Sequence, residues 1–206
     1  MVLEPTLVYE AAMLLTGREI YKQVQAGNIQ IDPFDQGRVN PNSYDLSLGD
    51  FVAVYSNWVV ELEPSPDGRH LYSRDNELDI KTKPEVMLYK IDPEVGWLLK
   101  PGIGYLMHTV ERIHTELFTP VLDGKSSIGR LFVAVHVTAG YGDTGFNGQY
   151  TLEVKVVHPI RVYPGIRFCQ MRFHVPTGDI TSYAGNYQGE AAVGPVPSRA
   201  HQSVFK

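Results

Sequence analysis

Short apolar runs bounded by glycine or proline recur along most of this 206-residue chain, and they constrain its fold more than any other feature. The runs are rich in Val, Ile, Phe, Tyr and Thr, which favour β-strands, and long stretches of helical periodicity are missing. The strands predicted in this way are Asp50–Tyr55, Gly104–Glu111, Arg130–Val137, Gln149–Val157, Ile160–Tyr163 and Ile166–Val175. Because many short strands pack most economically as a closed β-barrel or a jelly roll, we predict a mainly β fold of this kind.

One short helix is predicted near the N-terminus. Thr16 and Glu19 have the spacing of a capping box, in which the first residue caps the helix and the second reaches back to it. Gly27 suits the position just after a helix end, because glycine tolerates a left-handed backbone. The sequence therefore predicts a helix over Gly17–Ala26, preceded by an N-terminal arm of residues 1–15.

Length, charge and cysteine content narrow the class of protein. A chain of 206 residues can bury one hydrophobic core, so we expect residues 1–206 to form a single domain. The net charge of −5 provides no overall basic field for nucleic acid. Cys169 is the single cysteine, so no internal disulfide can form, and no apolar run approaches the roughly 20 residues that span a bilayer. These features predict a cytoplasmic protein with no nucleic-acid or membrane partner.

A polar cluster bounded by glycines runs from Gly124 to Arg130 and reads GKSSIGR. Its cations, hydroxyls and tight turns suit the binding of phosphate. It is not a P-loop, because that motif requires glycine at the position of Thr119. Taken alone, the cluster is more readily explained as an ordinary turn than as a phosphate site, since short motifs often mislead.

One acid stands out within a predicted strand. Alternation places Thr151, Glu153 and Lys155 on one face of the run and Leu152 and Val154 on the other. A carboxylate in an apolar strand is unfavourable unless it is paired, hydrogen-bonded or protonated. From the pattern alone, Glu153 is explained at least as well by a solvated strand acid as by a catalytic one.

The sequence argues against a zinc-dependent deaminase site. That class needs His-x-Glu followed by Pro-Cys-x-x-Cys. His114 and Glu116 supply the first half, but Cys169 is the only cysteine, so the second half cannot form. The other histidines show no ligand spacing. We therefore expect neither zinc nor another metal bound by the protein itself.

Several segments of the chain follow one another in an order that is itself specific. They are GKSSIGR (Gly124–Arg130), HVTAG (His136–Gly140), GDTGFNG (Gly142–Gly148) and TLE (Thr151–Glu153), extended by Ile31–Phe34, Asn42–Gly49, Tyr163–Gln170, Tyr187–Gly189 and Gly194–Arg199. This series resembles the dCTP deaminase family of the dUTPase-like superfamily, over nearly everything after about Leu15. The resemblance implies a distorted β-barrel assembled as a homotrimer, with active sites between subunits.

The resemblance also implies a catalytic centre that contains Glu153, Ser127 and Ala139. The matching glutamate of the family activates water for attack on C4 of cytosine and carries the proton to the departing ammonia, a task that suits a sheltered carboxyl. Asp143, which also suits a turn, is implied to accept a hydrogen bond from the deoxyribose 3′-hydroxyl. The implied substrate-binding residues are Lys125, Ser126, Ser127, Ile128, Gly129, Arg130, Asp143, Thr151, Leu152, Glu153, Gln170, Tyr183, Asn186 and Glu190. Mg²⁺ is expected to arrive with the triphosphate, which hard cations neutralise.

Residues 178–206 are rich in Gly, Pro, Ser and Ala and can bury little on their own, so we expect a tail that closes over the nucleotide. The tail departs from the family at Asn186, where a lysine is usual, and at Glu190, where a glutamine is usual. These changes imply weaker triphosphate binding or a different nucleotide. The loop between Tyr183 and Tyr187 is also shorter than is usual in the family, and it could instead move both residues away from the nucleotide.

The expected reaction is hydrolysis of dCTP to dUTP and ammonia in pyrimidine deoxynucleotide metabolism. Gly140 and Tyr141 resemble family members that also cleave the product to dUMP and pyrophosphate, although Gly142 replaces the usual aliphatic residue. One alternative is a dUTP diphosphatase without deamination, against which the TLE motif argues. The other is a nucleotide-binding homologue with altered catalysis, which Asn186 and Glu190 keep open.

Overall fold

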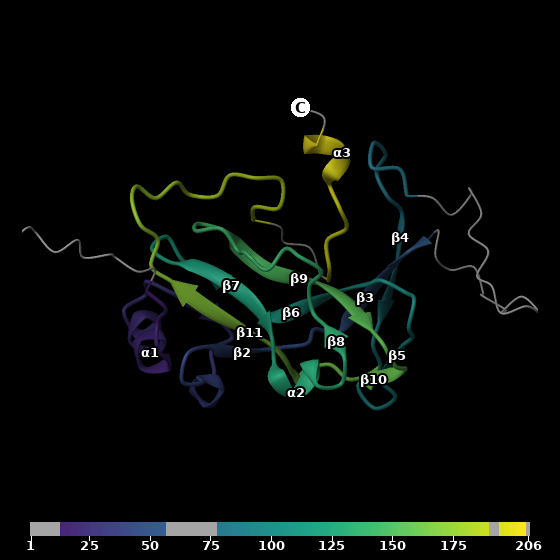
Figure 1. Ribbon diagram of the computed structural model, residues 1–206, viewed down its shortest axis with the longest axis horizontal. Helices are drawn as coiled ribbons and strands as arrows, with labels where there is room; N and C mark the ends of the chain where they lie inside the picture. The colour runs from purple at the N-terminus through teal and green to yellow at the C-terminus, as the bar shows by residue number, and fades with distance from the viewer. Residues whose placement is uncertain (1–12, 57–77, 190–193, 205–206) are drawn as a thin grey trace, which may run out of the picture.

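The computed structural model describes residues 13–56, 78–189 and 194–204 and shows a mainly β protein with a few short helices (Figure 1). The helices are α1 (Gly17–Gln25), the 3-10 turn η1 (Gln36–Arg38), α2 (Ser126–Gly129) and α3 (Ala200–Ser203). The strands are β1 (Gln30–Asp32), β2 (Tyr44–Ser47), β3 (Phe51–Tyr55), β4 (Val86–Lys90), β5 (Trp97–Leu99), β6 (Tyr105–His114), β7 (Thr119–Gly124), β8 (Val133–Ala134), β9 (Asn147–Val156), β10 (Ile160–Val162) and β11 (Arg167–His174). The mainly β prediction is confirmed.

The described strands form three antiparallel sheets that do not close into one barrel. The largest has the order β4-β3-β6-β9-β8, with β1 also paired to β6, and the others are β2-β11-β7 and β10-β5. A closed barrel would need the edge strands to pair, whereas β8 contributes only Val133 and Ala134 and pairs with β9 alone among the described strands. The prediction of a closed β-barrel is therefore corrected to open sheets around a shared core.

The core lies between the sheets, and β9 supplies one of its walls. Leu152 and Val154 of β9 are fully buried, whereas Thr151 and Glu153 are partly exposed and Lys155 is exposed. The predicted alternation on this strand is thus confirmed, with Glu153 on the face away from the core.

The predicted helix is confirmed to within one residue, since α1 spans Gly17–Gln25. Thr16 is the N-cap, and its hydroxyl accepts a hydrogen bond from the Glu19 N–H at 3.4 Å. The Glu19 carboxylate bonds Lys22 and Gln23 instead of the cap. No helix among the described residues is long and apolar enough to cross a membrane.

The predicted strand Arg130–Val137 is wrong over most of its length. The chain forms α2 just before it and then turns at Phe132, whose φ of 57° lies in the left-handed region that strands cannot use. Only Val133 and Ala134 pair with β9. Phe132 is 62% exposed, whereas Val133 and Val135 are buried in the core, so only part of this apolar segment serves the core.

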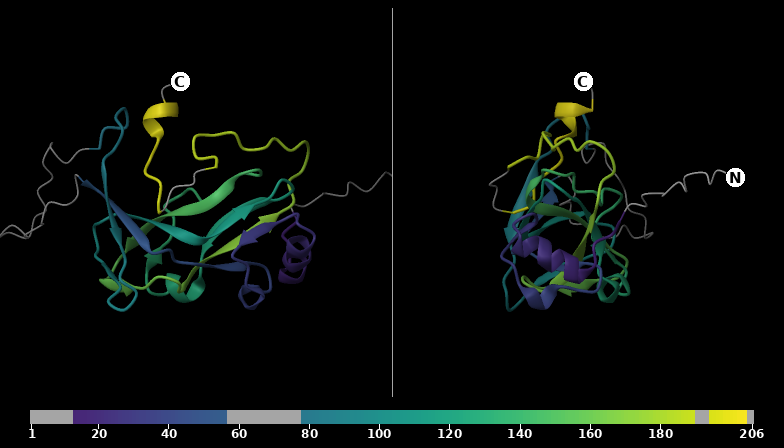
Figure 2. Two further views of the ribbon diagram at one scale, coloured as in Figure 1. Left: turned by 180° about the vertical axis from the view of Figure 1, so that it is seen from behind. Right: turned by 90° about the vertical axis from the view of Figure 1, so that its left-hand side faces the viewer.

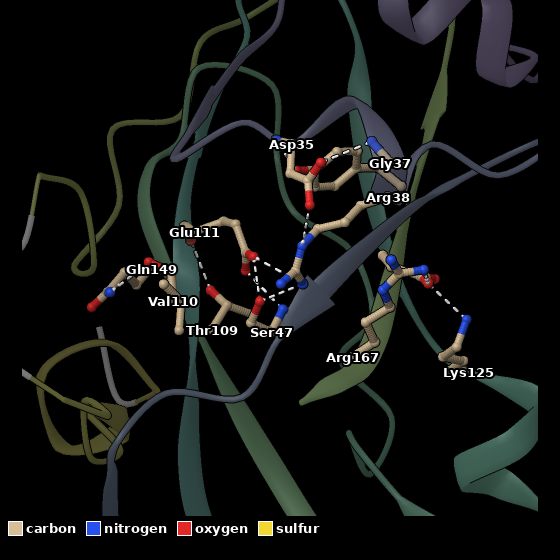
Figure 3. A network of polar contacts seen from close by, with 12 residues as sticks. Asp35, Gly37, Arg38, Ser47, Thr109, Val110, Glu111, Lys125, Gln149 and Arg167 are labelled. Atoms are coloured by element: carbon tan, nitrogen blue, oxygen red, sulfur yellow. Dashed lines mark hydrogen bonds and ion pairs between the residues drawn. The ribbon is translucent and has the colours of Figure 1, made fainter. Parts of the chain in front are cut away.

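Buried charges join η1, β2, β6 and the segment before α2 (Figure 3). Glu111 of β6 is 2% exposed, and its carboxylate accepts hydrogen bonds from the N–H of Ser47 at 2.8 Å and from the hydroxyl of Ser47 at 2.7 Å. The guanidinium of Arg38 lies 3.6 Å from the same carboxylate. Asp45 is fully buried and lies 2.7 Å from the ammonium of Lys125. Because buried charges are tolerated only when they are paired, this network fixes β2 against β6 and holds Lys125 in place.

Candidate active site

A cavity of about 490 Å³ lies between β9 and the C-terminal tail. Its lining residues are Tyr55, Leu106, Ala139, Tyr141, Gly142, Asp143, Phe146, Gly148, Gln149, Tyr150, Thr151, Glu153, Tyr183, Tyr187, Gly194, Val196 and Ser198. It therefore contains five of the residues predicted to act on a nucleotide, namely Ala139, Asp143, Thr151, Glu153 and Tyr183.

Glu153 is presented to this cavity with one oxygen already fixed. Its Oε2 accepts a hydrogen bond from the N–H of Val137 at 2.9 Å, and its own N–H donates to the carbonyl of Val135 at 3.1 Å. These bonds hold the carboxylate between β9 and the segment that leads to Ala139. A carboxylate with one anchored oxygen and one free oxygen beside a cavity is suited to accept and return a proton.

Asp143 lies in a loop whose shape is set by the backbone. The N–H of Gly142 donates to the carbonyl of Pro120 at 2.8 Å, and the N–H of Phe146 donates to the carbonyl of Asp143 at 3.1 Å. Asp143 is thus a turn residue, as its sequence context predicts, and its side chain is exposed at the cavity wall.

Sterics explain why residue 142 is a glycine. A Cβ atom there would lie 2.1 Å from the hydroxyl oxygen of Tyr150, far closer than real contacts allow. The phenol of Tyr150 fills the space beside Gly142, so an aliphatic side chain at this position would collide with it.

The tail folds over the cavity and is attached to its walls. The N–H of Tyr183 donates to the carbonyl of Thr144 at 2.8 Å, and the Tyr183 ring packs on Phe146 with centroids 5.8 Å apart. The N–H of Val196 donates to the hydroxyl of Thr151 at 3.0 Å. In Figures 1 and 2 the tail crosses the molecule at the end opposite to α2.

Asn186 is exposed and does not line the cavity. Its backbone carbonyl accepts a hydrogen bond from the guanidinium of Arg199, which also lies over the ring of Tyr187 at 5.6 Å. Arg199 therefore brings a positive charge next to the position where the tail lacks a lysine. Glu190, the other predicted departure, lies outside the described residues.

The remaining predicted residues form a separate group around α2. Ser126, Ser127, Gly129 and Arg130 are exposed, Lys125 and Ile128 are partly exposed, and Gln170 comes from the neighbouring β11. The amide of Gln170 donates to the carbonyl of Gly124 at 2.9 Å and accepts from Ser43 at 2.8 Å. Neither this group nor Leu152, whose side chain is buried in the core, lines the cavity.

The two groups have opposite charge. Among the described residues that line the cavity, the charged side chains are Asp143 and Glu153, both acids. The group around α2 carries Lys125 and Arg130, with Arg167 3.8 Å from the same buried Asp45. A polyphosphate needs cationic partners, which the lining residues of this cavity do not supply.

In the ranges that the structure describes, no group of three or more His, Cys, Asp or Glu side chains is arranged to hold a metal ion.

Two residues in or beside the cavity, Tyr55 in its lining and Gln188 in the tail, have no role in the sequence-based predictions. Gln188 donates to the carbonyl of Gly145 at 2.8 Å and accepts from the N–H of Asn147 at 3.1 Å, so it fastens the tail to the loop. Tyr55 accepts a hydrogen bond from the N–H of Ser198. The tyrosine in the Tyr187–Gly189 motif marked this part of the tail, whereas no local pattern connects Tyr55 to residues more than a hundred positions away.

Comparison with known proteins gives a consistent result. The sequence profile of a family described as dCTP deaminase-like matches residues 14–175. A protein from Leptospira biflexa named "dCTP deaminase, dUMP-forming" is 42% identical over 184 residues, which is 89% of this chain and 94% of the relative. A protein of the same name from Cytophaga hutchinsonii is 44% identical over 184 residues, which is 89% of this chain and 95% of the relative. The crystal structure of 2′-deoxycytidine 5′-triphosphate deaminase from Agrobacterium tumefaciens has a similar fold, with a TM-score of 0.57 and 22% identity over 80% of this chain and 49% of that one.

Proposed function

This chain belongs to the dCTP deaminase-like family, and on that basis we propose that it hydrolyses dCTP to dUTP and ammonia and then cleaves dUTP to dUMP and pyrophosphate. The observation that carries the proposal is the Glu153 carboxylate, which is anchored by the N–H of Val137 at the edge of a cavity large enough for a nucleoside. The second step is supported by relatives named as dUMP-forming.

In the proposed deamination, the free oxygen of Glu153 takes a proton from a water molecule as the water oxygen adds to C4 of cytosine. The protonated carboxyl then gives this proton to the amino nitrogen, the C4–N bond breaks and ammonia leaves, while the remaining proton of the added hydroxyl passes to N3 as the C4 carbonyl of uracil forms. The bond from Val137 keeps the carboxylate in one orientation during both transfers. Ala139, which lines the same cavity, lies on the segment that positions this bond.

Asp143 is proposed to accept a hydrogen bond from the 3′-hydroxyl of the deoxyribose. Its exposed carboxylate at the cavity wall is available for this contact. Phe146, whose ring packs against Tyr150 and Tyr183, provides an apolar wall beside it. The sugar would thus lie between the 142–147 loop and the tail.

The phosphates are proposed to contact a second copy of the chain. The charged side chains of the cavity lining are acids, whereas Lys125, Ser126, Ser127 and Arg130 do not line it; α2, to which this segment belongs, lies on the side of the molecule opposite to the tail (Figure 1). Exposed apolar side chains adjoin this segment, at Leu131, Phe132, Val137 and Val157. Exposed apolar clusters of this kind support a subunit contact, and a closed ring of three copies, as in the family, would bring the cations of one copy to the cavity of the next.

The proposed reaction is tested by incubating the purified protein with dCTP. We expect one ammonia, one dUMP and one pyrophosphate for each dCTP consumed, measured by an ammonia assay and by chromatography of the nucleotides. Release of ammonia with accumulation of dUTP would limit the enzyme to the first step. Cleavage of added dUTP without any ammonia from dCTP would contradict deamination and identify a diphosphatase.

Mg²⁺ is proposed to enter as part of the substrate, bound to the triphosphate. The single cysteine, Cys169, is fully buried and cannot form the paired-cysteine zinc site of other deaminases. We expect chelation to slow turnover, added Mg²⁺ to restore it, and elemental analysis of the purified protein to detect no stoichiometric zinc. One tightly bound zinc per chain that turnover requires would contradict this mechanism.

A further inference from the structure

Tyr150 of β9 has a buried hydroxyl for which the described part of the chain provides no hydrogen-bond partner. The residue is 9% exposed, and its hydroxyl forms no hydrogen bond within residues 13–56, 78–189 and 194–204. Alternation along β9 assigns Tyr150 to the core face with Leu152 and Val154, yet Tyr150 also lines the cavity. Since buried polar groups in folded proteins are nearly always hydrogen-bonded, an unpartnered hydroxyl at a cavity wall points to a ligand.

A bulge in the neighbouring strand sets the position of Tyr150. The pairing between β6 and β9 shifts register between His108 and Arg112, opposite Tyr150. There the N–H of Tyr150 donates to the hydroxyl of Thr109 at 3.0 Å, and Thr109 in turn donates to the carbonyl of Glu111 at 2.8 Å. Figure 3 shows Thr109, Val110 and Glu111 at this bulge, joined to the buried Arg38 network. Bulges of this kind redirect side chains beside functional sites.

The ring of Tyr150 is fixed on its other sides as well. It meets the Phe146 ring edge-on, with centroids 5.2 Å apart. Its hydroxyl lies in the space left by Gly142, where a Cβ atom would approach it to 2.1 Å. Burial and the neighbouring Asp143 carboxylate both raise the pKa of Tyr150, so the phenol keeps its proton at neutral pH and acts as a donor.

We infer that the hydroxyl of Tyr150 donates a hydrogen bond to the 3′ oxygen of the bound deoxyribose, which makes Tyr150 a specificity-determining residue of the sugar subsite. The inference rests on the proposed function, in which Asp143 accepts the hydrogen of the same 3′-hydroxyl. Tyr150 and Asp143 line the same cavity, and the Tyr150 hydroxyl lies against Gly142, the residue next to Asp143, so the two groups flank one part of the cavity. A hydroxyl of the sugar can accept one bond and donate another, which satisfies both partners at once.

The central test is Tyr150→Phe, which removes the hydroxyl and keeps the ring. We expect kcat/KM for dCTP to fall by about five- to tenfold, the effect of one hydrogen bond to the ligand. The inhibition constant of 2′,3′-dideoxycytidine triphosphate against dCTP deamination should change by less than about twofold. That analogue lacks the 3′-hydroxyl, so it never forms the hydrogen bond that the substitution removes.

Tyr105→Phe is the matched control. Tyr105 is equally buried, but its hydroxyl accepts a hydrogen bond from the N–H of Lys100 at 2.8 Å and lies outside the cavity lining. Its loss should lower Tm by about 2–4 °C with kcat/KM unchanged. Tyr150→Phe should not lower Tm, because no bond within the described chain is lost.

Gly142→Ala is a second variant, which changes the position of the Tyr150 hydroxyl without changing Tyr150 itself. The added methyl group must displace the phenol, so kcat/KM for dCTP should again fall more than the affinity for the dideoxy analogue. The inference is overturned if Tyr150→Phe leaves kcat/KM for dCTP within about twofold of wild type, or if it weakens dCTP and the dideoxy analogue equally. Failure of the wild-type protein to release ammonia from dCTP would instead refute the proposed function.

Discussion

Glu153→Gln is expected to slow the release of ammonia from dCTP by about 10²–10⁴-fold, the usual contribution of a general acid and base. The amide oxygen of glutamine can still accept the hydrogen bond that Val137 donates at 2.9 Å, so the side chain keeps its orientation. The amide cannot, however, accept a proton from water or return one to the amino group. The expected signature is a loss of kcat with little change in the affinity for dCTP, measured by calorimetry.

Glu94→Gln is the matched control, because it makes the same chemical change at an exposed position that is not part of the cavity lining. It should leave both kcat and the affinity for dCTP unchanged. If Glu153→Gln retains more than about half of the wild-type rate, Glu153 does not carry the proton. If the variant loses activity because it no longer binds dCTP, the carboxylate acts in binding and the assignment as a catalytic base is wrong.

The parts of the fold that the sequence predicts well are those with local signals. The helix α1 has a capping residue at Thr16 and a glycine after its end, and β9 alternates between core and surface along its length. Both patterns are visible within about ten residues, because they arise from the periods of helix and strand.

Other strands have no local signal. All four residues of β2, Tyr44–Ser47, are buried, so no alternation marks it. Its polar residues are stabilised by partners far away in the chain, Asp45 by Lys125 and Ser47 by Glu111. Pro120 in β7 similarly reads as a strand breaker, although β7 pairs along β11. These elements depend on tertiary contacts that no short window contains.

The candidate site likewise contains residues that local motifs indicate and residues that only the folded structure reveals. The motifs single out Glu153 and Asp143, and both line one cavity, Asp143 from the loop before β9 and Glu153 from β9 itself. They do not indicate Tyr150, because alternation assigns it to the core, whereas in the structure it also lines the cavity opposite a bulge in β6. Nor do they reveal that Lys125–Arg130 lies apart from Glu153 within one chain.

The separation of Arg130 from Glu153 leads to a test with mixed subunits. Arg130 is exposed, and removing its charge should not disturb the core, unlike the loss of Lys125, which would leave buried Asp45 without its closest cation. A chain with Arg130→Gln and Ser127→Ala should bind the triphosphate poorly, since charge-assisted hydrogen bonds contribute roughly 1.5–3 kcal/mol each. We expect its kcat/KM for dCTP to fall by about 10²-fold.

Coexpression of that chain with a Glu153→Gln chain should restore activity that neither has alone. If each site combines Glu153 of one copy with Arg130 and Ser127 of the next, random mixing of equal amounts in a closed ring gives about one intact site in four. Deamination of dCTP by the mixed assembly should therefore reach about a quarter of the wild-type rate, whereas the separately purified proteins mixed without subunit exchange stay inactive. A mixed assembly whose rate equals the average of its two parents would mean that Arg130 and Glu153 act within one chain. The cavity would then have to obtain its cations from the tail, where Arg199 already lies against Asn186 and Tyr187.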